Sequence, residues 1–122
     1  MNKQIKYART PEEIMHGLEQ KNRLLNQKNA EFEDLAEKKA QTEKDYKMAV
    51  REQILRHKTD GHPATLIPKL VEGHKAVADL KFAFDVADAI LKANLESCKD
   101  IRSQIDTYRS MLSYIKYEAT GG

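Results

Sequence analysis

The second half of the chain carries a heptad repeat of apolar residues. Its first set of positions, stepping by seven, is Leu70, Val77, Phe84, Leu91, Cys98, Ile105 and Leu112. The second set, three residues further on, is Gly73, Leu80, Ala87, Asn94, Ile101, Tyr108 and Ile115. Every position in the first set and five in the second are apolar. Because a 3.5-residue period forms one stripe along a helix, the sequence predicts an all-α, coiled-coil-like protein.

Two long segments around one turn predict a helical hairpin. We expect a first helix over about 11–58, a turn over 59–65 and a second helix over about 66–118, together forming one domain of residues 1–122. The turn contains the Asp-Gly and His-Pro signals that end helices. A turn this short forces the two long helices to run antiparallel.

Both predicted helices have recognisable start signals. Thr10 can cap the first helix, Pro11 suits its first position, and Glu13 can complete a capping box. Thr65 is the predicted cap of the second helix, and Pro68 falls within its first turn, where proline removes no intrahelical hydrogen bond.

The first helix has too few large apolar residues to cover the stripe of the second, so we read it as the outer, wetter partner. The stripe is also widened by apolar residues at the g positions, which are Ala76, Ala83, Ile90 and Met111. Since burying a Leu or Ile gains about 1.5–3 kcal/mol, we expect a second copy to complete an antiparallel four-helix bundle. The predicted oligomer seam is Leu70, Val77, Phe84, Leu91, Ile105 and Leu112. Asn94 either fixes the register of this assembly or faces solvent where the bundle opens.

Composition argues for a protein of the cytoplasm. The net charge is +2, so no global excess favours nucleic acid or a membrane surface. The single cysteine, Cys98, fits a reducing compartment and occupies a heptad position where it behaves as a small buried hydrophobe. Residues 1–10 lack the apolar segment of a signal peptide, and no apolar run is long enough to span a bilayer.

The sequence predicts neither an enzyme nor a cofactor. It contains no Gly-rich phosphate loop, nucleophile elbow or Ser–His–Asp spacing. His57, Asp60 and His62 cluster around the turn, but zinc sites usually show tighter ligand pairing, so we interpret them as solvated turn residues and expect no metal. Asp85 and Asp88 are interpreted as solvent-facing or paired with nearby lysines, which are Lys81 and Lys92.

Basic residues gather toward one end of the predicted hairpin. Arg102, Arg109 and Lys116 recur every seven residues along one edge of the second helix. The basic residues at the chain start are Lys3, Lys6 and Arg9. Such an end can contact phosphates, which makes single-strand nucleic-acid binding an alternative function. Coiled coils also place charge at these positions for solubility and interhelical pairing, and that interpretation is favoured.

Residues 61–73, followed by residues 77–81 and 85–89, resemble small helical proteins from the early regions of phages and prophages of Gram-positive bacteria. In those proteins a Gly-x-Pro-x-Thr-Leu-Ile turn joins two charged helices, and here it is met by Gly61, Pro63, Thr65, Leu66 and Ile67. The resemblance covers roughly residues 55–115. It implies a phage early protein encoded near recombination and single-strand-binding genes, and it supplies no catalytic residues.

We therefore expect a non-enzymatic protein that binds a host or phage protein of the nucleic-acid-handling machinery, as an inhibitor, an anti-defence factor or a recombination accessory. A structural coiled coil that builds an assembly is a further alternative. The predicted partner-binding residues are His57, Asp60, His62 and Leu66 at the hairpin tip, and Arg102, Arg109 and Lys116 at the basic end.

Overall fold

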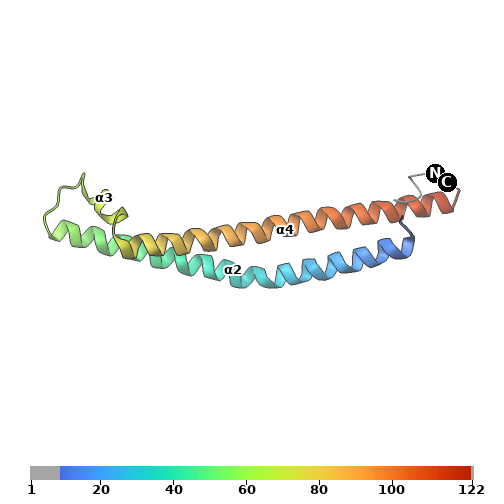
Figure 1. Cartoon of the computed structure of the whole chain (residues 1–122), viewed down its shortest axis with the longest axis horizontal. Coiled ribbons are helices and arrows are strands. Elements are labelled where there is room, and N and C mark those ends of the chain that lie inside the picture. Colours follow the sequence, from blue (N-terminus) through green and yellow to red (C-terminus); the bar gives the residue numbers. More distant parts are fainter. Residues whose placement is uncertain (1–8, 122) are drawn as a thin grey trace. The chain divides into compact units, whose positions relative to one another are not determined.

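The computed structural model describes residues 9–121, which form three helices (Figure 1). The long helices are α2, Pro11–Thr59, and α4, Lys75–Ala119, and the short helix α3, Ile67–Glu72, lies between them in the chain. The described range contains no strand, and α2 packs against α4, so the predicted all-α helical hairpin is confirmed. Across residues 9–121, no helix combines the length and the apolar character that crossing a membrane requires.

The chain divides into two compact units. Unit 1 consists of Met1–Glu31 and Leu95–Gly122, and unit 2 is Phe32–Asn94. Each unit contains one part of α2 and one part of α4, which lie side by side and run antiparallel within it (Figure 1). Unit 2 also contains α3 and the turn that precedes it.

The heptad stripe of α4 faces inward. From Val77 to Ile115, every position of the two heptad sets is buried or half-buried. Asn94 is only 5% exposed, so the solvent-facing interpretation of this residue was wrong. Cys98 is buried as predicted, with its Sγ 3.7 Å from Oδ1 of Asn29. The single chain therefore already buries most of the surface that the heptad pattern marks.

The start of α2 is the predicted capping box. The backbone N–H of Glu13 donates to Oγ1 of Thr10 over 3.1 Å, and the backbone N–H of Thr10 donates to Oε1 of Glu13 over 3.4 Å. Two amides that no intrahelical carbonyl can reach are satisfied in this way. The reciprocal pair explains why the helix begins at Pro11.

The second predicted helix, 66–118, is interrupted, which the sequence did not predict. Its first turns form α3, and the chain leaves the helix at Gly73 and His74 before α4 begins. The backbone N–H of His74 donates to the carbonyl of Val71 over 3.1 Å, a tighter turn than an α-helix makes. Glycine has the weakest helix propensity after proline, which explains why the break falls at this position.

The predicted cap of that helix was also wrong. The N-cap of α3 is Leu66, and no side chain caps the helix by a hydrogen bond. Thr65 therefore does not have the role that its residue type suggested. Pro68 does lie in the first turn of α3, as expected.

Helix α3 is held by a small core of unit 2. Ile67 and Val71 of α3 are buried together with Val77 of α4. The half-buried residues that pack against them all come from α2 and are Tyr46, Ala49, Val50 and Ile54. The ring of Tyr46 also stacks on Phe84 of α4, with 6.2 Å between ring centroids. Short as it is, α3 is thus fixed to both long helices by apolar contacts.

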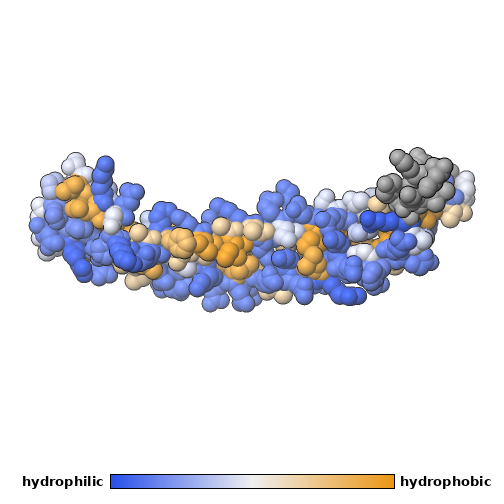
Figure 2. Space-filling model, in the orientation of Figure 1, coloured by the Kyte–Doolittle hydropathy of each residue, from blue (hydrophilic) through white to orange (hydrophobic). Residues whose placement is uncertain are grey.

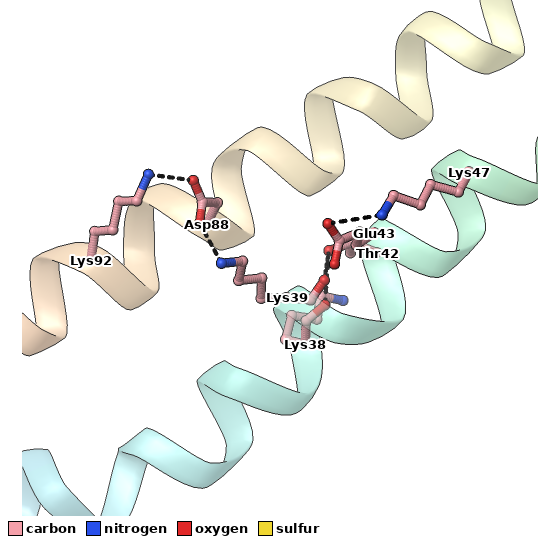
Figure 3. A network of polar contacts seen from close by, with 7 residues as sticks. All are labelled: Lys38, Lys39, Thr42, Glu43, Lys47, Asp88 and Lys92. Atoms are coloured by element: carbon pink, nitrogen blue, oxygen red, sulfur yellow. Dashed lines mark hydrogen bonds and ion pairs between the residues drawn. The ribbon is translucent and has the colours of Figure 1, made fainter. Parts of the chain in front are cut away.

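A polar bridge joins α2 to α4 within unit 2 (Figure 3). Asp88 of α4 pairs with Lys39 of α2 over 3.0 Å and with Lys92 of its own helix over 2.8 Å. Hydrogen bonds from Lys92 and then Lys39 hold the pKa of the Asp88 carboxyl below its ordinary value. The predicted pairing of Asp88 with Lys92 is confirmed, as is that of Asp85 with Lys81 over 2.8 Å.

Candidate protein-binding site

An apolar groove lies in unit 2 where α2, α3 and α4 meet. We call it the α3 groove; its volume is about 680 Å³. Its lining residues are Tyr46, Val50, Ile54, Lys58, Ala64, Ile67, Pro68, Val71, Glu72, Val77, Ala78, Lys81, Phe82 and Asp85. Most of these side chains are apolar, and they come from all three helices and the turn. The groove exists because the break at Gly73 lets α3 leave the line of α4 and form a wall of its own.

The charged residues that line the α3 groove have both signs. Lys58 and Lys81 are basic, whereas Glu72 and Asp85 are acidic. Nζ of Lys81 lies 2.8 Å from Oδ2 of Asp85, and this hydrogen bond raises the pKa of the Lys81 ammonium. All four residues are exposed. An apolar centre with charged, solvated residues around it has the composition of a protein interface.

Helix α4 carries a second apolar stripe in unit 2. Its members follow each other at intervals of three or four residues, which places them on one helix face, and they are Ala78, Phe82, Val86, Ala89 and Ala93. All five are exposed. Phe82 is 71% exposed and Val86 41% exposed. We call this set the outer stripe.

The outer stripe continues the α3 groove, because Ala78 and Phe82 belong to both. Figure 2 shows hydrophobic side chains gathered at the α3 end and along part of the helices. Sequence reasoning missed the outer stripe because it followed the stronger heptad pattern. The i, i+4 spacing of Ala78, Phe82 and Val86 was the signal that could have revealed it.

The structure brings three of the four predicted tip residues together. His57 lies in the last turn of α2, and its ring lies 5.2 Å from that of His62, edge to face. Asp60 completes the cluster, and one ligand atom from each of the three residues lies within 4.8 Å of the others. Leu66 is exposed at the start of α3 and is not part of this cluster.

The predicted basic residues lie in unit 1. Arg102, Arg109 and Lys116 are all exposed. Nη1 of Arg109 lies 4.0 Å from Oδ1 of Asp106, so part of the basic charge on this edge is compensated. Arg9 does reach α4, since its Nη1 donates to the hydroxyl of Tyr108 over 3.1 Å. Lys3 and Lys6, the other members of the predicted basic end, fall outside the described residues.

Comparison with known proteins adds no relative. No protein-family model matches the chain, and neither a curated protein nor a solved structure matches it. The α3 groove, the outer stripe and the tip are the features of the structure that bear on function.

Proposed function

We propose that this protein is not an enzyme and acts by binding another protein, with the α3 groove and the outer stripe as its docking surface. The observation that carries the proposal is the position of Phe82, which is 71% exposed at the point where groove and stripe meet. A large aromatic side chain left in solvent beside an apolar groove forgoes stabilisation that a partner can supply. Aromatic residues are also enriched among those that dominate binding energy at interfaces.

The shape of this surface favours an amphipathic helix as the bound element. The outer stripe runs along α4 for about four turns between Ala78 and Ala93, at 3.6 residues per turn. A helix whose apolar side chains recur every three or four residues can follow such a stripe and place its end in the groove. The charged residues of the groove, Lys58 and Glu72 among them, can then contact the polar flanks of the bound helix.

The class of partner that we propose follows from the turn. Its resemblance to phage and prophage early proteins supports a host or phage partner from the machinery that handles nucleic acid. The effect on that partner would be inhibition, anti-defence or support of recombination. In this role the protein would act in the cytoplasm of the host cell.

A dimer of the chain is a second proposal, carried by Ile90. This residue occupies a g position of the heptad and is 49% exposed, so α2 leaves it largely uncovered. A second copy that covers Ile90 would form the four-helix bundle predicted from the sequence. Sedimentation equilibrium of the wild type and Ile90→Asp tests it, and a monomeric wild type contradicts it.

Capture from host lysate tests the main proposal. Purified wild-type protein, Phe82→Asp and the matched control Tyr117→Asp serve as baits, with and without nuclease. Tyr117 lies in unit 1 and is 60% exposed, so both substitutions add a charge at an exposed aromatic position. We expect one protein to be retained by the wild type and Tyr117→Asp, to survive nuclease, and to be lost by Phe82→Asp.

Other outcomes overturn the proposal. Retention that disappears with nuclease and depends steeply on salt favours the nucleic-acid alternative. If Phe82→Asp retains the partner protein as well as the wild type does, the α3 groove and the outer stripe are not the docking surface. If Phe82→Asp abolishes only self-association, the stripe is an interface between copies of the chain.

A further inference from the structure

We propose that the tip of unit 2 binds a divalent transition-metal ion of the Zn²⁺ class through His57, Asp60 and His62. The three side chains come from the last turn of α2 and the turn that follows it. Two imidazoles and a carboxylate are a ligand set suited to Zn²⁺ and its borderline neighbours. The proposal is independent of the function proposed above.

The backbone explains why these residues meet. The N–H of His62 donates to the carbonyl of His57, and the N–H of Gly61 donates to that of Lys58, each over 3.1 Å. With Gly61 at φ +83°, this is the Schellman ending of a helix. That motif places the side chain of its last residue against the side chain five positions earlier, usually as an apolar contact. Here the two positions hold His57 and His62.

The contact of the two rings is therefore built by the helix ending itself. Asp60, which lies between the two histidines in sequence, adds a carboxylate oxygen within 4.8 Å of one ring nitrogen of each histidine. Ligand atoms around a tetrahedral Zn²⁺ lie about 3.3 Å apart when the bonds are about 2.0–2.1 Å long. Asp60 and His62 are exposed, so rotation of their side chains can close the remaining distance.

An independent observation comes from His57. Both of its ring nitrogens are shielded from solvent, and neither has a hydrogen-bond partner among the described residues. Its interpretation as a solvated turn residue was therefore wrong. A buried polar atom without a partner is costly, and a metal ion bound to one ring nitrogen would satisfy it.

The location also favours a cation. The ligands lie at the C-terminal end of a helix of 49 residues, where the backbone dipole leaves partial negative charge. The carboxylate of Asp60 adds a formal negative charge. Three protein ligands leave a fourth tetrahedral position open to water or to a donor from another molecule.

Calorimetric titration of the untagged, chelator-treated chain with ZnCl₂ tests the proposal. We expect one ion per chain, and at least about tenfold weaker affinity for His57→Gln, Asp60→Asn and His62→Gln, because even outer-shell partners of metal ligands are typically worth 10–100-fold. His16→Gln and His74→Gln are the controls and should bind as the wild type does. His74 is the stricter control, since its Nδ1 is also buried and has no hydrogen-bond partner among the described residues, but lies outside the cluster.

A second measurement guards against loss of fold in the variants. Zn²⁺ should raise the melting temperature of the wild type more than that of His62→Gln at the same concentration, while circular dichroism shows equal helix content. The proposal is overturned if the wild type does not bind Zn²⁺, if His57→Gln and His62→Gln bind it as tightly as the wild type, or if His74→Gln weakens binding as much as they do.

Discussion

Gly17 of α2 lies directly against the ring of Tyr108 of α4. A Cβ atom at position 17 would stand 2.8 Å from Cζ of the tyrosine and 2.9 Å from its hydroxyl oxygen. Arg9 also contacts the Tyr108 ring. Its Nη1 donates to the tyrosine hydroxyl over 3.1 Å, and the guanidinium carbon of Arg9 lies 5.6 Å from the ring centroid. Gly17 is thus where a tyrosine ring of α4 packs against the backbone of α2 in unit 1.

Gly17→Ala is expected to lower the free energy of unfolding by about 1 kcal/mol. Overpacking costs of about 1–3 kcal/mol outweigh the gain in helix propensity of about 1 kcal/mol. Urea denaturation measures the difference. In a Tyr108→Ala background the same substitution should be stabilising, because the obstructing ring is gone. Equal effects in both backgrounds would show that Tyr108 does not require the glycine.

Two other glycines should respond to alanine in opposite directions. Gly61 has φ +83°, a left-handed conformation that costs an alanine about 1–2 kcal/mol. Gly73 has φ −80° and room for a methyl group 3.4 Å from the nearest atom. Gly73→Ala should therefore stabilise the protein by about 0.4–1 kcal/mol, by reducing the freedom of the unfolded chain. Both variants are compared with the wild type by denaturation in the presence of chelator. Stabilisation by Gly61→Ala would contradict the assigned helix ending.

Asp88→Asn should lower stability at pH 7 and have little effect in acid. The pKa of Asp88 is lowered in the folded protein by Lys92 and Lys39, so the folded state favours the ionised carboxylate. Its stabilising contribution is complete above the ordinary carboxyl pKa of about 4 and is lost as the pH falls through the lowered value. Thermal melts of both proteins between about pH 7 and pH 2 measure this. A difference that stays constant across the range would contradict the ionic role.

Asp85→Asn is the matched control for that experiment. Asp85 pairs with Lys81 of its own helix, whereas Asp88 pairs with Lys92 of its own helix and also with Lys39 of α2. Exposed pairs within one helix contribute little. Asp85→Asn should therefore change the melting temperature less than Asp88→Asn does at pH 7.

Much of the fold followed from local chemistry. The heptad predicted which face of α4 is buried, because a 3.5-residue period can bury only one stripe. Thr10 and Glu13 predicted the start of α2, because a capping box satisfies amides that have no other partner. The turn was predicted from its Asp-Gly and His-Pro signals, and Gly61 of that turn does adopt a positive φ of 83°.

The missed features depend on tertiary contacts. Gly73 is one of several glycines, and the sequence does not show that Ile67 and Val71 pack against α2, the contact that accompanies the break. Thr65 has a capping side chain, but α3 begins two residues later at Ile67, so its hydroxyl cannot serve. The shielding of the His57 ring depends on its neighbours in space. The outer stripe was visible as a pattern, yet only the structure shows that α2 and α3 leave it exposed.

The central claim is that a partner protein docks on the α3 groove and the outer stripe. Site-specific photo-crosslinking with a benzophenone amino acid at position 82, and at position 117 as the control, tests it most directly in host lysate treated with nuclease. The account predicts an adduct with one other protein from position 82 and none from position 117. Adducts only between copies of the chain, or equal adducts from both positions, would contradict it.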